Sequence, residues 1–407
     1  MSGTEIAQLI VLVYFFLING SRTLLTVFAF PDVRRQLRRS FIEDRPWLNR
    51  SRLAPGVSII APAHDQAASI VDSVRALLTN HYPMFEVMVV DDGSTDDTLA
   101  RLTETFNMRK VYRLQRDDLK TLAVRAVYVS DDYDNLTVLA KDHGGRADAL
   151  NAGINAAKYP YFYSVDAHVT LEKDALLHTM TPIMRNPARV VASAGIVQTA
   201  TSPGHLSMSR AIERIHGFTT GRAGLSALRS LLIINRASGV LRTDIARSVG
   251  GYAPGTVGEG TELLVRVHRT LRERKADYRI LYLARPVACI TVPETLKALD
   301  RRRARYRRSI AETLWRHKRM IFNLRYGRIG TFAMPFMLLV DFADPIAEVL
   351  SFALVIFWWI TGQLTWSFSG WFFSFAILWS ILLALAAALF RDLSTTWYHR
   401  AASPTRR

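Results

Sequence analysis

The sequence predicts an α/β protein in which a doubly wound, mainly parallel sheet forms a large domain with membrane helices on either side of it. Two observations predict this class. Short apolar runs alternate with helix-patterned segments through the middle of the 407 residues, and long apolar segments lie near both ends. Alternating strands and helices are typical of a parallel sheet covered by helices, whereas apolar segments of about 20 residues are typical of membrane crossings.

Four apolar runs are predicted to form strands of the sheet. A helix pattern over residues 70–78 separates the first two runs, and a second helix is expected over residues 147–157. Ligands of such sheets bind beyond the carboxyl ends of the strands, and acidic residues follow two of these runs, at Asp91-Asp92 and at Asp166. The expected strands are residues 56–61, 85–90, 136–140 and 161–165.

The charge of the chain indicates a membrane surface. Lys and Arg total 52 against 35 Asp and Glu, which gives a formal net charge of +17. Residues 300–328 mix basic side chains with aromatic and aliphatic ones and run into an apolar region, as amphipathic segments at anionic headgroups do. An RNA-binding arm is the alternative, but no nucleic-acid motif accompanies the segment. Lipid headgroups are therefore expected partners, and nucleic acid is not.

Three segments are expected to cross the membrane. Residues 6–30 are preceded by one charge, Glu5, and followed by a cluster of arginines, so the positive-inside rule puts the N-terminus outside. Residues 346–360 and 371–390 form a returning pair that ends in a basic tail. The pattern predicts a multi-pass protein of the inner (cytoplasmic) membrane, with the main domain and the C-terminus in the cytoplasm. The single cysteine, Cys289, excludes an intrachain disulfide and agrees with a reducing compartment.

The predicted domain organisation follows from these segments. An N-terminal anchor is expected over residues 1–33 and the sheet domain over residues 55–298. A basic amphipathic segment, 299–330, precedes an interfacial stretch and two spanning helices, 331–390, and the tail is 391–407.

An acidic turn follows the second predicted strand. Asp91 and Asp92 stand at the strand end and precede Gly93 and Ser94. Carboxylates in this position can bind the hydroxyls and base of a nucleotide. The alternative is an ordinary turn, for which Asp, Gly and Ser are common residues.

A basic and glycine-rich segment follows the third predicted strand. Lys141 and Arg146 flank Gly144-Gly145, so that they can reach a phosphate or a base while the glycines allow close backbone approach. Asp148 begins a predicted helix, where a negative charge is favoured in any case. Asp148 alone is ambiguous, and the whole set in this order is more specific than any member.

With these motifs the chain resembles the membrane-bound family 2 (GT-A) glycosyltransferases of the polysaccharide-synthase type, such as cellulose, hyaluronan and poly-N-acetylglucosamine synthases, and their single-transfer relatives. The resemblance covers about residues 55–330 and implies a GT-A fold, inverting transfer from a UDP-sugar, and a Mg²⁺ or Mn²⁺ ion on the diphosphate. The motifs that match are 89–98, 141–151, 250–252, 256–259, 262–266, 293–295 and 326–330. The donor-binding residues it implies are Asp91, Asp92, Lys141, Arg146, Asp148, Asp166, Arg302, Arg305 and Tyr306.

Two departures from the family affect the metal and the catalytic base. The family's Asp-any-Asp metal motif is Asp166-Ala-His168 here, and an imidazole suits Mn²⁺ better than Mg²⁺. The base of the family is the Asp of a Glu-Asp pair, which reads Glu259-Gly260. Glycine cannot accept a proton, so the role would fall to Glu259, to Glu262 or to no residue.

A third departure lies in the family's Gln-x-x-Arg-Trp motif. Arg302 and Tyr306 replace the amide and the indole, while Arg305 is kept to face a diphosphate. Two hypotheses follow. The first is a membrane glycosyltransferase with altered metal use and slow or specialised transfer. The second is a pseudoenzyme, a nucleotide-sensing or scaffold subunit. Because three spanning helices are few for a polymer channel, a partner synthase or export subunit, or a homo-oligomer, is expected.

Overall fold

The computed structural model describes residues 2–43, 54–113, 116–166, 169–199, 221–234, 239–290 and 296–375, together with 377–379, 381, 382 and 385. The chain forms two compact units. The sheet unit comprises residues 42–202 and 231–317, and the helical unit comprises residues 1–41, 203–230 and 318–407. The acidic and glycine-rich motifs at residues 91–92, 141–151 and 259–262 all fall in the sheet unit.

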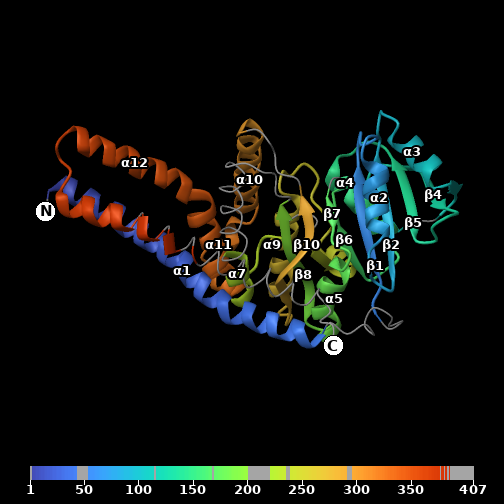
Figure 1. The fold of residues 1–407 in the computed structure, drawn as a ribbon, viewed down its shortest axis with the longest axis horizontal. Coiled ribbons are helices and arrows are strands. Elements are labelled where there is room, and N and C mark those ends of the chain that lie inside the picture. Colours follow the sequence, from blue (N-terminus) through green and yellow to red (C-terminus); the bar gives the residue numbers. More distant parts are fainter. Residues whose placement is uncertain are drawn as a thin grey trace, which may run out of the picture. The chain divides into compact units, whose positions relative to one another are not determined.

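The four predicted strands form the parallel centre of a ten-stranded sheet (Figure 1). β1 (Val57–Ala63) pairs in parallel with β2 (Phe85–Asp92) on one side and with β6 (Tyr161–Ser164) on the other. β5 (Leu136–Lys141) pairs in parallel with the other edge of β2. The predicted strands are confirmed, with ends shifted by one or two residues.

The sheet is mixed outside this centre. The prediction of a mainly parallel sheet is therefore right for the central strands and wrong for the flanks. On one flank the cause is a short connection, because only five residues, 131–135, join β4 to β5 and so short a turn produces antiparallel neighbours. The flanking strands are β3 (Met108–Val111), β4 (Val124–Ser130), β7 (Thr170–Leu171), β8 (Val190–Thr199), β9 (Gly239–Arg242) and β10 (Arg279–Ile290). Of these, β8 and β10 pair in parallel, whereas β9 is antiparallel to both β6 and β8.

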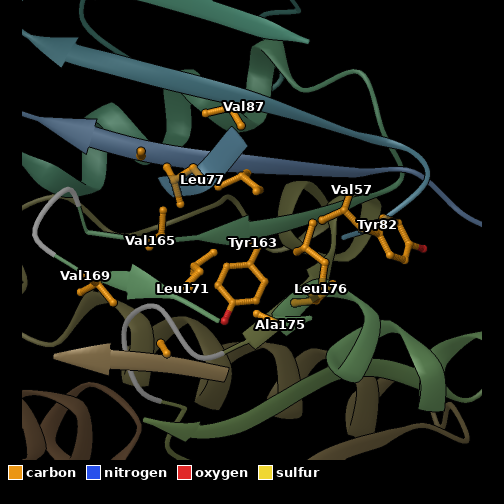
Figure 2. Close-up of a cluster of buried hydrophobic side chains, with 14 of the residues drawn as sticks. Val57, Leu77, Tyr82, Val87, Tyr163, Val165, Val169, Leu171, Ala175 and Leu176 are labelled. Carbon is orange, nitrogen blue, oxygen red and sulfur yellow. The ribbon is translucent and has the colours of Figure 1, made fainter. Parts of the chain in front are cut away.

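Helices cover the sheet and fix its core. The side chains of Ile70, Val74 and Leu77 recur at helical spacing on α2 and are fully buried in the cluster that Figure 2 shows around Tyr163. Full burial of such a side chain stabilises the fold by about 1.5–3 kcal/mol. The helices of the sheet unit are α2 (Ile70–Leu78), α3 (Thr98–Thr105), α4 (Arg146–Ala156), α5 (Ala175–Arg185), α8 (Thr243–Ser248), α9 (Glu259–Glu273) and α10 (Leu296–Arg316).

A glycine lets α4 approach the sheet closely. A Cβ at Gly153 would lie 2.3 Å from Cγ2 of Ile60 on β1, so no larger residue fits there without displacement. Asn151 on the same helix binds both backbone groups of Tyr252, at 2.7 and 2.8 Å. α4 is thereby fixed to the sheet and to the segment before α9, and its first turn occupies a defined place beside the strand ends.

The helical unit contains one long apolar helix. α1 (Gly3–Glu43) contains Pro31 within its length. It ends ten residues after residue 33, where the anchor is predicted to end. Among the described helices, its segment Gly3–Gln36 is the one long and apolar enough to cross a membrane. The elements with given bounds among the described residues of this unit also include α7 (Ala223–Ala227), η3 (Lys318–Met320), η4 (Leu324–Tyr326), η5 (Ile329–Ala333), α11 (Met334–Phe336), η6 (Met337–Ala343) and α12 (Asp344–Ile360).

Polar contacts join α1 to the C-terminal elements within the helical unit. Tyr14 Oη donates to Asp344 Oδ1 at 2.8 Å, and Arg22 Nη2 donates to Asp344 Oδ2 at 2.5 Å. The second predicted crossing corresponds to α12, which has 17 residues. The third, residues 371–390, is helical at each of its described residues, which are 371–375, 377–379, 381, 382 and 385. The tail 391–407 lies outside the described residues. The predicted basic segment 299–330 divides between the units after His317.

Candidate nucleotide-binding site

Asp92, at the carboxyl end of β2, is the centre of a buried polar network. Its carboxylate accepts hydrogen bonds from Lys141 Nζ at 2.8 Å and from the backbone N–H groups of Gly144 and Gly145 at 3.0 and 2.8 Å. Burial alone would raise the pKa of Asp92, but these donors and the charge of Lys141 outweigh it and hold the pKa below its ordinary value. The structure thus brings the acidic turn and the glycine-rich segment together, as the sequence predicts.

Lys141 is enclosed by this network. Its side chain is fully buried, and Nζ lies 2.8 Å from Asp92 Oδ1 and 2.5 Å from Asp148 Oδ2. Asp148 also accepts from the backbone N–H of Leu122, at 3.2 Å. In this geometry the Lys141–Asp148 pair shapes the loop from inside, whereas the sequence suggested direct contact of Lys141 with a phosphate or base. Because both side chains of the Lys141–Asp148 ion pair are buried, Lys141 is not exposed to a ligand in the way that the sequence suggested.

Gly144 is required by the same packing. A Cβ at this position would lie 2.6 Å from Asp148 Oδ2, so a side chain at Gly144 would displace the carboxylate that holds Lys141. Gly145, the residue before α4, has φ +84°, a conformation that favours glycine. The two glycines therefore allow the backbone N–H groups to point at Asp92.

Two histidines lie at this edge of the sheet, although their sequence positions show no metal-ligand spacing. His64 follows β1, and its Nδ1 lies 3.0 Å from the carbonyl oxygen of Asp92. His143 Nδ1 lies 2.9 Å from the same oxygen, and the two imidazole centroids are 4.3 Å apart. Both side chains are about half exposed. The pair offers exposed ring surface beside the acidic turn, and only the parallel register of β1 and β2, which aligns Ala63 with Asp91, could have indicated it.

Asp91 contributes a buried carboxyl group beside these rings. It accepts a hydrogen bond from Ser94 Oγ at 2.5 Å. Burial raises the pKa of Asp91, although the hydrogen bonds from Ser94 act in the opposite direction. Asp91 and Asp92 are neighbours in sequence, but their environments shift their pKa values in opposite directions.

Arg146 bridges two carboxylates, Asp166 after β6 and Glu259 at the start of α9. Its Nε donates to Asp166 Oδ1 at 2.7 Å and its Nη1 donates to Glu259 Oε1. Burial would lower the pKa of Arg146, but the charges of Asp166 and Glu259 outweigh it and raise it. Its Nη2 is buried and makes no hydrogen bond to any described residue. Arg146 is therefore the cation placed directly beside Asp166.

A small cavity lies beside Arg146 and the start of α9. It has a volume of about 50 Å³, and Arg146, Ser164, Tyr252 and Gly260 are among its lining residues. A Cβ at Gly260 would meet no atom within 4 Å. A Cβ is therefore tolerated at position 260, where the resemblance places the family's base.

Glu262 is tied to other partners. Its carboxylate accepts from Arg266 Nη2 at 2.6 Å and lies 3.2 Å from His317 Nε2. Burial would raise the pKa of Glu262, but the hydrogen bonds from His317 and Arg266 and the charge of Arg266 outweigh it and lower it. A paired carboxylate with a lowered pKa is a poor proton acceptor. His317 is thus the second partner of the Glu262 carboxylate, beside Arg266. No sequence motif indicates this contact.

The remaining predicted residues lie elsewhere or outside the described chain. Arg302, Arg305 and Tyr306 lie on the exposed first half of α10, in contrast to the buried carboxylates, and Tyr306 is 42% exposed. His168 and the motif 293–295 lie outside the described residues.

The residues present fit a divalent ion through one oxygen ligand. Asp166 supplies a carboxylate of the kind that Mg²⁺ and Mn²⁺ prefer, and Arg146 already occupies one of its oxygens. Across the described part of the chain, no group of three or more His, Cys, Asp or Glu side chains could enclose an ion.

The chain is similar in sequence to known glycosyltransferases. Residues 58–223 match the family model "Glycosyl transferase family 2". The chain is 22% identical over 370 residues to a poly-beta-1,6-N-acetyl-D-glucosamine synthase of Staphylococcus epidermidis, covering 86% of this chain and 80% of that one. It is 24% identical over 291 residues to the probable glycosyltransferase YdaM of Bacillus subtilis, covering 70% and 62%.

A solved structure shares the fold. The mannosyltransferase PcManGT from Pyrobaculum calidifontis, in complex with GDP-Man and Mn²⁺, superposes with a TM-score of 0.57 at 17% identity. The match covers 96% of this chain and 97% of that one.

Proposed function

We propose that this chain, whose residues 58–223 match the family 2 glycosyltransferase model, is a membrane glycosyltransferase that transfers a sugar from a UDP-sugar with inversion, in polysaccharide or glycoconjugate synthesis. The observation that supports this most directly is the Asp92 network, in which two backbone N–H groups and a buried lysine preorganise the turn at the carboxyl end of β2. Such rigid polar support is typical of a functional site rather than of a simple turn.

The groups open to a nucleotide divide into two sets. The ring surfaces of His64 and His143, together with Asp91, are suited to a base and a ribose. Arg146 and Asp166 are suited to the diphosphate and the sugar, because the guanidinium offers a fixed positive charge beside the carboxylate. Lys141 and Asp148 support the first set from inside the protein.

A divalent ion belongs to the proposal with Asp166 and His168 as its protein ligands. When bound, it would supply positive charge to the leaving diphosphate. Because an imidazole ligand suits Mn²⁺ better than Mg²⁺, Mn²⁺ is the expected preference. The chain itself contributes the charge of Arg146 to the same region.

The described residues of the site offer no unpaired carboxylate as a proton acceptor. Glu259 is paired with Arg146, Glu262 is paired with Arg266 and His317, and Gly260 has no side chain to offer. Losing a positioned general base costs on the order of 10²- to 10⁴-fold in rate. We therefore expect slow transfer, and the same observation favours the second candidate function, a catalytically inactive nucleotide-sensing or scaffold subunit.

Donor turnover separates the two candidates. With the protein in nanodiscs, UDP release from a panel of UDP-sugars with Mn²⁺ or Mg²⁺ is expected, and Asp166→Ala should reduce it by about 10²-fold or more, as loss of an electrostatic catalytic group does. Asp131→Ala is the matched control. That carboxylate is exposed and pairs with Arg109 on β3, the edge strand of the sheet. UDP binding without any release would instead establish the pseudoenzyme.

The proposed membrane topology has the N-terminus outside and the sheet unit and C-terminus in the cytoplasm, with α1, α12 and residues 371–390 crossing. In a Cys289→Ser background, an impermeant maleimide should label Ser2→Cys and Ser367→Cys on intact cells. Ser403→Cys should react only after permeabilisation. Labelling of Ser403→Cys on intact cells would exclude three crossings. A partner synthase or export subunit, or a homo-oligomer, remains part of the proposal, since three helices are few for enclosing a polymer.

A further inference from the structure

A second cavity lies at the opposite end of the sheet from the nucleotide residues. It has a volume of about 510 Å³, and all of its lining residues belong to the sheet unit. Tyr161, the first residue of β6, lines it, whereas Asp166 follows the last residue of that strand. Arg242, opposite Tyr161 on β9, lines it as well. The cavity is therefore at the amino ends of the parallel strands and is separate from the Asp92 network.

The lining of this cavity carries excess positive charge. Arg116, Lys158, Arg242 and Arg247 line it together with one carboxylate, Asp244. Arg242 binds that carboxylate through two hydrogen bonds, of 3.0 and 2.5 Å. Among the described residues, no carboxylate forms an ion pair with Arg116 or Lys158. The volume lies in the range of small-molecule sites, about 300–1,000 Å³.

Arg247 is held in the cavity wall, and one of its guanidinium nitrogens makes no hydrogen bond to any described residue. Its Nη2 donates to the carbonyl oxygen of Ile154, near the end of α4, at 2.5 Å. Its Nε is buried without a hydrogen bond and lies 3.4 Å from Asp118 Oδ2. Burial lowers the pKa of Arg247, and the positive charge of Arg116 lowers it further. The positive charges of Arg116 and Arg247 repel one another, and Asp118 and Asp244 offset this repulsion in part, so an anion near both cations would be favoured.

The segment that follows Arg116 is bound to α4 at Leu119. Asn155 on α4 accepts from the backbone N–H of Leu119 at 3.0 Å and donates to its carbonyl oxygen at 2.7 Å. Capping of the helix C-terminus explains why a cation such as Arg247 lies near Ile154. It does not explain Arg116, which lies on a different segment. Aromatic surface is also present, because Lys158 Nζ lies 5.4 Å from the ring centroid of Tyr159.

We propose that this cavity binds a small, free phosphorylated ligand of about nucleotide size, with Arg116, Lys158 and Arg247 contacting its phosphate group. Guanidinium and ammonium groups bind phosphate through strong charge-assisted hydrogen bonds, and the tyrosines offer planar surface to the rest of the ligand. α4 begins at Arg146 in the proposed donor site and ends beside this cavity, so the ligand would contact a helix that also serves the donor.

Binding of inorganic pyrophosphate tests the proposal. By calorimetry on the full chain in zwitterionic nanodiscs, the Arg116→Ala/Lys158→Ala variant should bind pyrophosphate about tenfold or more weakly than the unmodified protein, because it loses two charged hydrogen-bond donors. The matched control is Arg109→Ala/Lys110→Ala, which removes two exposed cations of β3 far along the sheet. UDP binding should change by less than about twofold in both variants, since each stays clear of the Asp92 network.

Three outcomes would overturn the proposal. The first is equal loss of pyrophosphate binding in both double variants. The second is complete displacement of pyrophosphate by UDP at a stoichiometry of one, which would assign the binding to the donor site. The third concerns the source of the phosphate: if the site variant loses binding to phosphatidylglycerol vesicles but keeps its affinity for pyrophosphate, the cavity is a lipid headgroup site. Lys158→Glu, a single exposed change, repeats the test should the double variant fold poorly.

Discussion

Gly260→Asp is expected to raise the rate of UDP release in the presence of an acceptor by about 10²-fold or more, because it restores a carboxylate at the position where the family carries its base. The structure has room for the new side chain, since a Cβ at Gly260 meets no atom within 4 Å. Arg146, which lines the same cavity and has an unpaired buried Nη2, would help keep the carboxylate ionised.

Gly260→Asn is the matched control for this gain. Asparagine has nearly the same shape as aspartate and accepts no proton at neutral pH, so it should leave the rate close to that of the unmodified protein. Equal rates for the two variants would mean that the added volume, not the base, is responsible. Absence of turnover in Gly260→Asp, with donor still bound, would mean that a missing base does not account for inactivity.

Lys141→Met should destabilise the sheet unit by about 3–5 kcal/mol, the cost of removing one member of a buried ion pair. Lys141 is fully buried between Asp92 and Asp148, and without it both carboxylates keep their burial and lose their counter-charge. Thermal unfolding in nanodiscs measures the effect. Lys110→Met, an exposed lysine on β3, is the control and should change stability by less than about 0.5 kcal/mol.

The pH dependence of this loss has a defined sign. The pKa of Asp92 is depressed in the folded protein, so its contribution to stability is present above the unfolded-state pKa of about 4 and is lost as the pH falls through the folded-state value. In Lys141→Met the depressing charge is gone and burial acts against the ionised form. The deficit of the variant should therefore be largest near neutral pH and smaller below about pH 4. A deficit independent of pH would mean that lost packing, not charge, dominates.

Contacts between residues at the ends of neighbouring predicted strands can be predicted from the sequence. Asp92, Lys141 and Asp148 come together because β2 and β5 are parallel neighbours and their carboxyl ends meet at one edge of the sheet. The bridge from Arg146 to Glu259 could not be predicted, because it joins residues 113 positions apart through the packing of α4 and α9.

The histidines show the same limit. His64 and His317 occupy no recognisable spacing, and each acquires its partner only through tertiary packing, His64 at the carbonyl oxygen of Asp92 and His317 at Glu262. The antiparallel flanks of the sheet depend on connection lengths that an apolar pattern does not define. Apolar periodicity indicates which face of an element is buried, but not which element covers it.

The length of α1 has a mechanical consequence. At a rise of 1.5 Å per residue, its 41 residues extend about 60 Å, roughly twice the thickness of the hydrocarbon core of a bilayer. In the proposed topology a helix of this length cannot lie wholly within lipid tails, so the part after Pro31, with Arg34, Arg35 and Arg38, would form a basic extension in the headgroup and water layers. Pro31 leaves the carbonyl of Val27 without its helical donor. Near the edge of the lipid, water can hydrate that carbonyl, so the proline interrupts the hydrogen-bond ladder where the interruption costs least.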